Sequence, residues 1–397
     1  MVRWLGFAVG LVLLLATASS VIKTLLIPRA SRSAFGSVLA WLVRGTFRKI
    51  TTRVEDLRQR ERILAASGPT WLVSLLVTWL ASLYIGYALL LWPLKQGGFT
   101  LALEESGSSI FTLGFVRPSG PAPSAIVFLA AASGLALVAM LIAYLPVLYA
   151  AFNRREIQVT TLEALAGAPA WGPELLSRQA LIGDVGYLPK VYERWTEWAA
   201  DISESHTSYR TLIYFRSPDP QASWLLSLLA VLDAAALHLA FNPSSAPPEA
   251  RPLLRVGYIT MRKLAKGTGI AVNDDPHPDD PLVLTRQEFD DAVEHMREAG
   301  WQFERDADAA WPHFHGWRVN YEAAAYGLAG FLDLPPALWS GDRPQHRSPP
   351  QLPTRPPHRE PGDPNEADPS HSAGRTRGVR AVRRAGQPGG RSLSAGP

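Results

Sequence analysis

The sequence predicts an all-α integral membrane protein with three transmembrane helices, a re-entrant loop, a cytoplasmic helical domain and a disordered tail. Three observations in the 397 residues lead to this fold class. Residues 63–94 and 118–153 carry no charge, and each stretch exceeds the roughly 20 apolar residues that cross a hydrocarbon core. A third uncharged stretch lies between Arg3 and Lys23. From residue 154 onward the apolar residues recur at helical spacing, as in a globular domain.

Residues 1–27 form the first expected span. The uncharged stretch is barely long enough, and it contains Ala16-Thr17-Ala18, which resembles a signal-peptide cleavage site. Residues 23–70, however, hold ten Lys or Arg against three acids, and basic segments beside a span remain in the cytoplasm. We therefore expect an uncleaved helix with its N-terminus outside. A cleaved signal peptide is the alternative.

Residues 28–66 form a basic linker with apolar residues at helical spacing. Such a helix would lie in the inner membrane interface, with its basic face toward anionic lipid headgroups. The side chains expected to contact those headgroups are Arg44, Arg48, Lys49 and Arg53. An ordinary connecting helix that docks on the cytoplasmic domain explains the same pattern, and the sequence does not separate the two.

Residues 67–153 are expected to form a span, a short return segment and a second span. Residues 99–111 would rise only about 20 Å as a helix, which cannot cross the membrane. A half-length helix that enters from outside can turn back only if its irregular return is buried in protein or lines water. Glu104 and Glu105 fit either solvated loop acids or charges at a pore mouth. In the second span, Gly134 and Pro146 are hinge candidates.

The segment Ser109 to Phe115, with a span on either side, resembles the two-helix pore module of potassium channels over residues 71–153. That family carries a Thr-Val-Gly-Tyr-Gly filter. The resemblance implies K⁺ or another monovalent cation as the permeant ion, and a homotetramer because each chain has one loop. It also implies these filter candidates: Ser109, Thr112, Leu113, Gly114 and Phe115. The chain departs from the family at Val116, in place of the second glycine, and at Arg117, where a positive charge at the mouth repels cations. An exterior linker is the alternative.

Residues 154–340 are expected to form the cytoplasmic helical domain. The best helix candidates are 171–182, 189–203, 220–241, 250–266, 285–300 and 321–332, and Thr285 to Glu288 has the pattern of a capping box. Residues 225–239 are apolar enough to suggest a fourth span. They contain Asp233 and His238 and are short, so we expect a buried core helix instead.

Chemical signatures are sparse. The chain has no cysteine, which excludes disulfides, thiolate catalysis and cysteine zinc sites. His313-x-His315 lacks an indicated third metal ligand, and Ser205-His206 lacks the glycines of a nucleophile elbow. We therefore expect no enzyme activity, no catalytic residue, no metal and no cofactor. The net charge of +4 reflects membrane-flanking clusters and tail arginines, so no nucleic-acid partner is expected. Residues 341–397 are rich in Pro, Gly, Ser and Arg, which predicts disorder.

Two functions remain open from the sequence. One is a bacterial cation channel in the plasma (inner) membrane, multi-pass, with its N-terminus outside, its C-terminal domain in the cytoplasm and four chains around one pore. The other is a non-conducting membrane anchor or scaffold that presents the cytoplasmic helical domain to partners.

Overall fold

The computed structural model describes residues 1–27, 34–54, 56–219, 221–342, 350, 352, 353 and 355. All regular structure in these ranges is helical and no strand occurs in them, which confirms the predicted all-α class. Met1 to Pro353 form one compact unit. Most of the tail predicted to be disordered, and residues 28–33 of the linker, lie outside the described residues.

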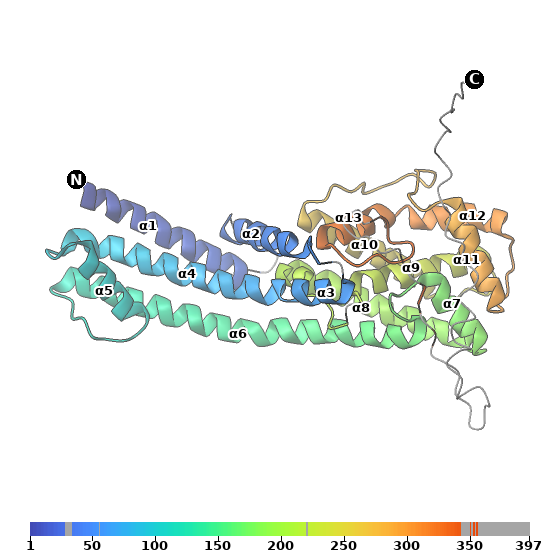
Figure 1. Cartoon of the computed structure of the whole chain (residues 1–397), viewed down its shortest axis with the longest axis horizontal. Coiled ribbons are helices and arrows are strands. Elements are labelled where there is room, and N and C mark those ends of the chain that lie inside the picture. The colour runs from blue at the N-terminus through green and yellow to red at the C-terminus, as the bar shows by residue number, and fades with distance from the viewer. Residues whose placement is uncertain are drawn as a thin grey trace, which may run out of the picture. The chain divides into compact units, whose positions relative to one another are not determined.

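The N-terminal half contains α1 (Val2–Val21), which continues as a π-helical turn over Ile22–Leu26. The linker forms α2 (Ala34–Thr51) and α3 (Leu57–Ala65). Then follow α4 (Ser67–Leu91), α5 (Gly98–Ile110) and α6 (Pro121–Ala166). α4 packs against α1, α5 and α6, and α2 lies beside α4 (Figure 1).

Four helices in the described ranges are long and apolar enough to cross a membrane: Val2–Leu26, Leu57–Leu94, Pro121–Ala166 and Trp224–Phe241. The first three expose apolar side chains. Examples are Val12 on α1, Val73 on α4 and Ile142 on α6, which are 67%, 61% and 66% exposed. Exposed apolar faces on long helices indicate a membrane-embedded protein.

Small residues let α1 and α4 approach closely. A Cβ atom added to Gly10 would lie 2.7 Å from the backbone oxygen of Gly86. Nearby, Trp79 is fully buried and donates a hydrogen bond from Nε1 to Ser20 Oγ (3.1 Å). Small residues and interhelical hydrogen bonds are the usual basis of helix pairing in lipid, where the hydrophobic effect does not drive association.

α6 belongs to two hydrophobic cores. Its Ala130, Leu137 and Tyr144 are buried with residues of α4, whereas Val159 and Leu162 are buried in the core of the C-terminal domain. At 1.5 Å per residue its 46 residues span about 69 Å, more than twice a hydrocarbon core of about 30 Å. The expected boundary between residues 153 and 154 therefore lies inside a continuous helix, because Arg154 changes the polarity of the chain without ending the helix.

The C-terminal domain consists of α7 (Gly172–Leu181), α8 (Leu188–Ser208), α9 (Trp224–Phe241), α10 (Ala250–Thr268), α11 (Arg286–Glu298), α12 (Ala307–Arg318) and α13 (Glu322–Leu332). Every residue of α9 is buried, against α7, α8, α10, α12 and α13. Glu193 and Glu197 on α8, and Arg251 and Arg255 on α10, are exposed. The predicted burial of this helix is confirmed, since the domain surrounds it and carries its charges on the outer faces of α8 and α10.

A buried charge network ties α9 to the last two helices. Arg318 is fully buried, and its Nη1 donates to Asp233 Oδ1 (2.5 Å) while its Nε donates to Glu322 Oε1 (2.9 Å). Tyr321 donates to the same Asp233 oxygen (2.8 Å), and Glu322 accepts the backbone N–H of Leu284 (3.1 Å). Removing one member of such a network would leave a buried charge without its partner.

Candidate functional site

The half-length helix predicted between the two spans is α5. It packs against both α4 and α6, and its buried face includes Glu105, Ser106 and Ser109. Ser106 Oγ donates to the backbone oxygen of Tyr84 on α4 (2.8 Å), and Ser109 Oγ donates to the Glu105 oxygen (2.7 Å). These bonds satisfy the small polar side chains that face the neighbouring helix.

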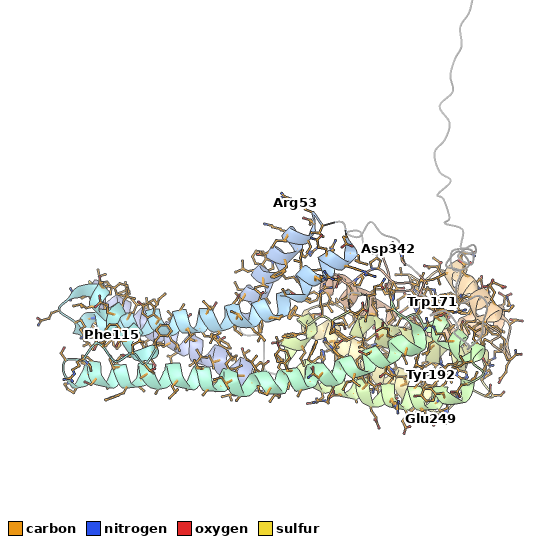
Figure 2. The ribbon with its side chains drawn as sticks, turned by 60° about the horizontal axis from the view of Figure 1, so that its bottom comes forward. Arg53, Phe115, Trp171, Tyr192, Glu249 and Asp342 are labelled. Carbon is orange, nitrogen blue, oxygen red and sulfur yellow. The ribbon has the colours of Figure 1, made fainter. Side chains whose placement is uncertain are left out.

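The filter candidates after α5 form a helix cap. Thr112 has a left-handed backbone (φ 53°), and Leu113 and Gly114 both donate their N–H groups to the Ser108 oxygen (2.8 and 3.2 Å). Thr112 donates to the Ser109 oxygen (3.1 Å), which completes a Schellman-type termination. Leu113 and Phe115 are 64% and 66% exposed, and Figure 2 shows Phe115 at the end of the ribbon far from Trp171 and Tyr192.

The charges near this segment are distributed unequally. Glu105 is fully buried, with Oε2 2.6 Å from the Lys95 ammonium, so it is not a solvated acid in this chain. Glu104 and Arg117 are exposed. Burial of a carboxylate requires a paired cation, and Lys95, which ends the uncharged stretch of the sequence, supplies it.

The two hinge candidates lie in unbroken helix. α6 remains helical through the exposed Pro146. A Cβ atom at Gly134 would lie 2.5 Å from the backbone oxygen of Ile110, so this glycine allows the end of α5 to approach α6. Whether either residue permits bending remains a prediction.

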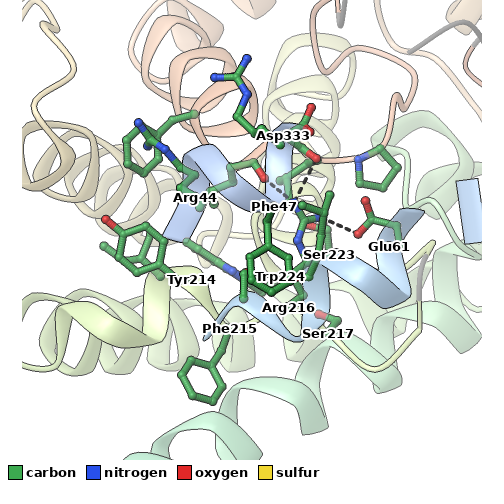
Figure 3. Close-up of a pocket in the computed structure, with 18 of the residues that line it drawn as sticks. Arg44, Phe47, Glu61, Tyr214, Phe215, Arg216, Ser217, Ser223, Trp224 and Asp333 are labelled. Atoms are coloured by element: carbon green, nitrogen blue, oxygen red, sulfur yellow. Dashed lines mark hydrogen bonds and ion pairs between the residues drawn. The ribbon is translucent and has the colours of Figure 1, made fainter. Parts of the chain in front are cut away.

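A second group of functional candidates lies where the linker meets the C-terminal domain; we call it the linker–domain junction (Figure 3). Arg60 Nη2 lies 2.6 Å from Asp333 Oδ2, and both side chains are almost completely buried. Arg216 pairs with Glu61 and donates to the Asp333 backbone oxygen (3.1 Å). The cavity here is about 50 Å³, small beside the roughly 300–1,000 Å³ of typical ligand pockets, so the ion pairs that fasten the linker are the main feature of the junction.

The four linker cations expected at lipid headgroups are placed differently. Arg44 is half-buried, with its guanidinium carbon 4.2 Å from the ring centroid of Phe331, whereas Arg48, Lys49 and Arg53 are exposed. α2 also exposes the apolar Val38, Trp41, Leu42 and Ile50. The linker therefore docks on the domain, as expected for a connecting helix. It also presents an apolar and basic surface, as expected for a helix in the membrane interface.

Arg155 is a central residue that the sequence did not single out. It is fully buried, and its guanidinium donates to Glu156 Oε1 (2.7 Å) and to the backbone oxygens of Leu212 (3.0 Å) and Phe215 (2.8 Å). It thereby fixes the turn 210–215 on α6. The only sequence signal is its position directly after an uncharged stretch, which equally marks an ordinary membrane flank.

The Ser205-His206 pair is packed inside the same region. His206 Nε2 lies 3.2 Å from Arg155 Nη1, and its Nδ1 lies 3.0 Å from Ser205 Oγ, which donates to the Asp201 oxygen. Since Arg155 can only donate, Nε2 accepts, and the imidazole is neutral. Burial and the Arg155 charge both lower the pKa of His206 well below its ordinary value. Both side chains are buried, so the pair offers no open nucleophile.

The remaining sequence candidates do not converge on a site. His315 Nδ1 lies 2.7 Å from the Pro278 oxygen. Among the described residues, no group of three His, Cys, Asp or Glu side chains has a metal-binding arrangement. Comparisons with family models, with curated proteins and with solved structures found no match for this chain.

Proposed function

We propose that this protein is a non-conducting membrane anchor that holds its helical domain against the inner face of the plasma membrane. The observation that carries the proposal is the double attachment of the domain. α6 runs from the apolar region into the domain core, and the linker is fastened by the buried Arg60–Asp333 and Arg216–Glu61 pairs. A domain attached at two points keeps a fixed orientation toward the membrane.

The segment after α5, residues 111–117, supports the proposal that the protein does not conduct ions. The N–H groups of Leu113 and Gly114 bind the Ser108 oxygen, and that of Val116 lies 3.3 Å from Ser108 Oγ. These bonds terminate α5, so the segment serves as a helix cap within one chain. Lys95 neutralises Glu105, and the exposed Arg117 would repel cations from the same end.

Reconstitution into vesicles tests the proposal. We expect the passive flux of K⁺, Na⁺ and Rb⁺ through vesicles with the purified protein to equal that through protein-free vesicles. Native mass measurement of the same sample gives the assembly state. Cation flux from a homotetramer that is lost in Gly114→Val would overturn the anchor proposal.

A cation channel is the second candidate, because α5 has the half length of a pore helix and packs against both flanking spans. In this function four copies would surround Thr112, Leu113, Gly114 and Phe115. The cysteine-free chain allows a direct comparison by single-cysteine labelling at Ser109, Leu113 and Phe115. A channel gives labelling that K⁺ suppresses in a graded pattern, whereas an anchor labels fast at Leu113 and Phe115 and slowly at the buried Ser109, with or without K⁺.

The proposed topology has the N-terminus and the 95–120 connection outside and everything after residue 154 in the cytoplasm. It rests on the basic excess of residues 23–70. Reporter fusions after Gly97 and Glu156 should report the exterior and the cytoplasm, respectively. The opposite pair of signals would invert the topology.

A further inference from the structure

A cavity of about 300 Å³ lies between the C-terminal domain and four parts of the N-terminal half: the turn after α1, the first part of α2, the start of α4 and the middle of α6. Its wall on the domain side comes from residues 207–211, 213 and 214 and from the ends of α10 and α13. We propose that this cavity binds the phosphate headgroup of one anionic phospholipid from the inner leaflet. This goes beyond the proposed function and does not depend on whether the protein conducts ions.

The charges of the cavity select an anion. Lys23, Arg44 and Arg210 line it, and no carboxylate is among the lining residues. Within the described part of the chain, no ion pair joins any of these three cations to an acid. Arg44 is held in position by the ring of Phe331 beneath its guanidinium (4.2 Å to the centroid). Three cations without a nearby acid would be satisfied by a phosphate, which accepts several charge-assisted hydrogen bonds.

The arrangement of the cavity wall selects a lipid over a free anion. Trp71 and Tyr144 line one side, and both belong to the uncharged stretches of the spans. Tyr144 also packs edge-on against Tyr209 (5.8 Å between centroids), which connects this side to the domain. Aromatic side chains of the spans and basic side chains thus line one cavity, and both kinds of residue are typical of the headgroup level of a bilayer.

The volume allows the headgroup but not the acyl chains, since about 300 Å³ is the lower limit of typical ligand pockets. The chains can remain in the bilayer, because apolar residues beside the cavity face outward. Leu26 and Ile27, at the end of the π-helical turn, are 58% and 48% exposed, and Trp41 on α2 is 69% exposed; Ile27 and Trp41 also line the cavity. The bound lipid would thus be an additional contact between the spans and the domain.

Native mass spectrometry of the full chain in neutral detergent tests the site, with phosphatidylglycerol, phosphatidylcholine or inorganic phosphate added. We expect one phosphatidylglycerol per chain to bind at least tenfold more tightly than phosphatidylcholine, and inorganic phosphate not to compete at equal concentration. Equal binding of the two lipids, or full competition by inorganic phosphate, would overturn the lipid site.

Matched variants locate the site. Arg44→Gln/Arg210→Gln should lose the tenfold preference, whereas Lys49→Gln/Arg53→Gln, which removes two exposed linker cations outside the cavity, should retain it. If circular dichroism shows that the cavity variant does not fold, Lys23→Gln in the π-helical turn after α1 replaces it, because Lys23 is exposed. Its expected loss of preference is smaller. Equal effects of the cavity and linker variants would assign the preference to the basic surface and refute the cavity.

Discussion

Gly134→Ala tests how α5 is seated on α6. The added methyl carbon would lie 2.5 Å from the backbone oxygen of Ile110, 3.1 Å from its Cγ2 and 3.2 Å from its carbonyl carbon. Carbon atoms in proteins pack at about 3.5–4.0 Å, so the end of α5 must shift by a few tenths of an ångström or more. Overpacking of this kind costs about 1–3 kcal/mol.

Alanine also brings a gain of up to about 1 kcal/mol in helix propensity. Gly45→Ala in α2 isolates this gain, because no atom lies within 4 Å of an added Cβ at Gly45. We therefore expect the free energy of unfolding of Gly134→Ala to fall about 1–3 kcal/mol below that of Gly45→Ala. Equilibrium unfolding in mixed detergent micelles, followed by circular dichroism, measures both variants beside the wild type. Equal stability of the two variants would refute the close contact between α5 and α6.

Three further outcomes are expected. The pKa of His206 in the folded protein lies below its ordinary value of 6.5, so its contribution to stability is complete above pH 6.5. Below pH 6.5 that contribution falls by up to about 1.4 kcal/mol per pH unit. The difference between the melting temperatures at pH 8 and pH 5.5 should therefore be smaller in His206→Gln than in the wild type, and an equal difference would contradict the assignment. Gly10→Leu should lower the free energy of unfolding in detergent by about 1–3 kcal/mol, because the added side chain pushes α1 away from α4. Val9→Leu, on the exposed face of α1, should have little effect in the same unfolding measurement, and equal effects would refute the close contact. Arg318→Met should lower the free energy of unfolding by about 3–5 kcal/mol, because it leaves buried carboxylates without a partner. Arg297→Met at an exposed position should lower it by less than about 0.5 kcal/mol. Urea titration followed by tryptophan fluorescence measures both variants, and equal losses would refute the role of the buried network.

Local patterns predicted much of the helical structure. The uncharged stretches correspond to α1, α4 and the first part of α6, and residues 99–111 correspond to α5 within one residue. Thr285 and Glu288 form the predicted capping box, because both partners lie within one turn of the chain. Such features depend on neighbours in the sequence, which are visible without a structure.

Contacts between distant segments were not predictable. Residues 211–215 alternate in polarity like a short strand, yet Arg210–Tyr214 form a 3₁₀ turn. The buried Arg155 holds it by binding the backbone oxygens of Leu212 and Phe215. Gly134 is a hinge candidate in the sequence, but in the structure a Cβ placed there would meet the backbone oxygen of Ile110, the last residue of α5. Similarly, Glu105 can be buried because the ammonium group of Lys95, which precedes α5, pairs with its carboxylate.

Because α6 is continuous, the number of residues between its two buried segments determines how the two cores are rotated relative to each other. Ala151 is buried in the core of the spans and Val159 in the core of the domain, within one helix. Each residue of an α-helix advances the chain by about 100° and 1.5 Å. A single inserted residue between these two positions would turn one core by about 100° against the other, whereas seven inserted residues would return it to within about 20°. The relative rotation of the domain and the spans is thus set by the number of residues between Ala151 and Val159, whatever their side chains.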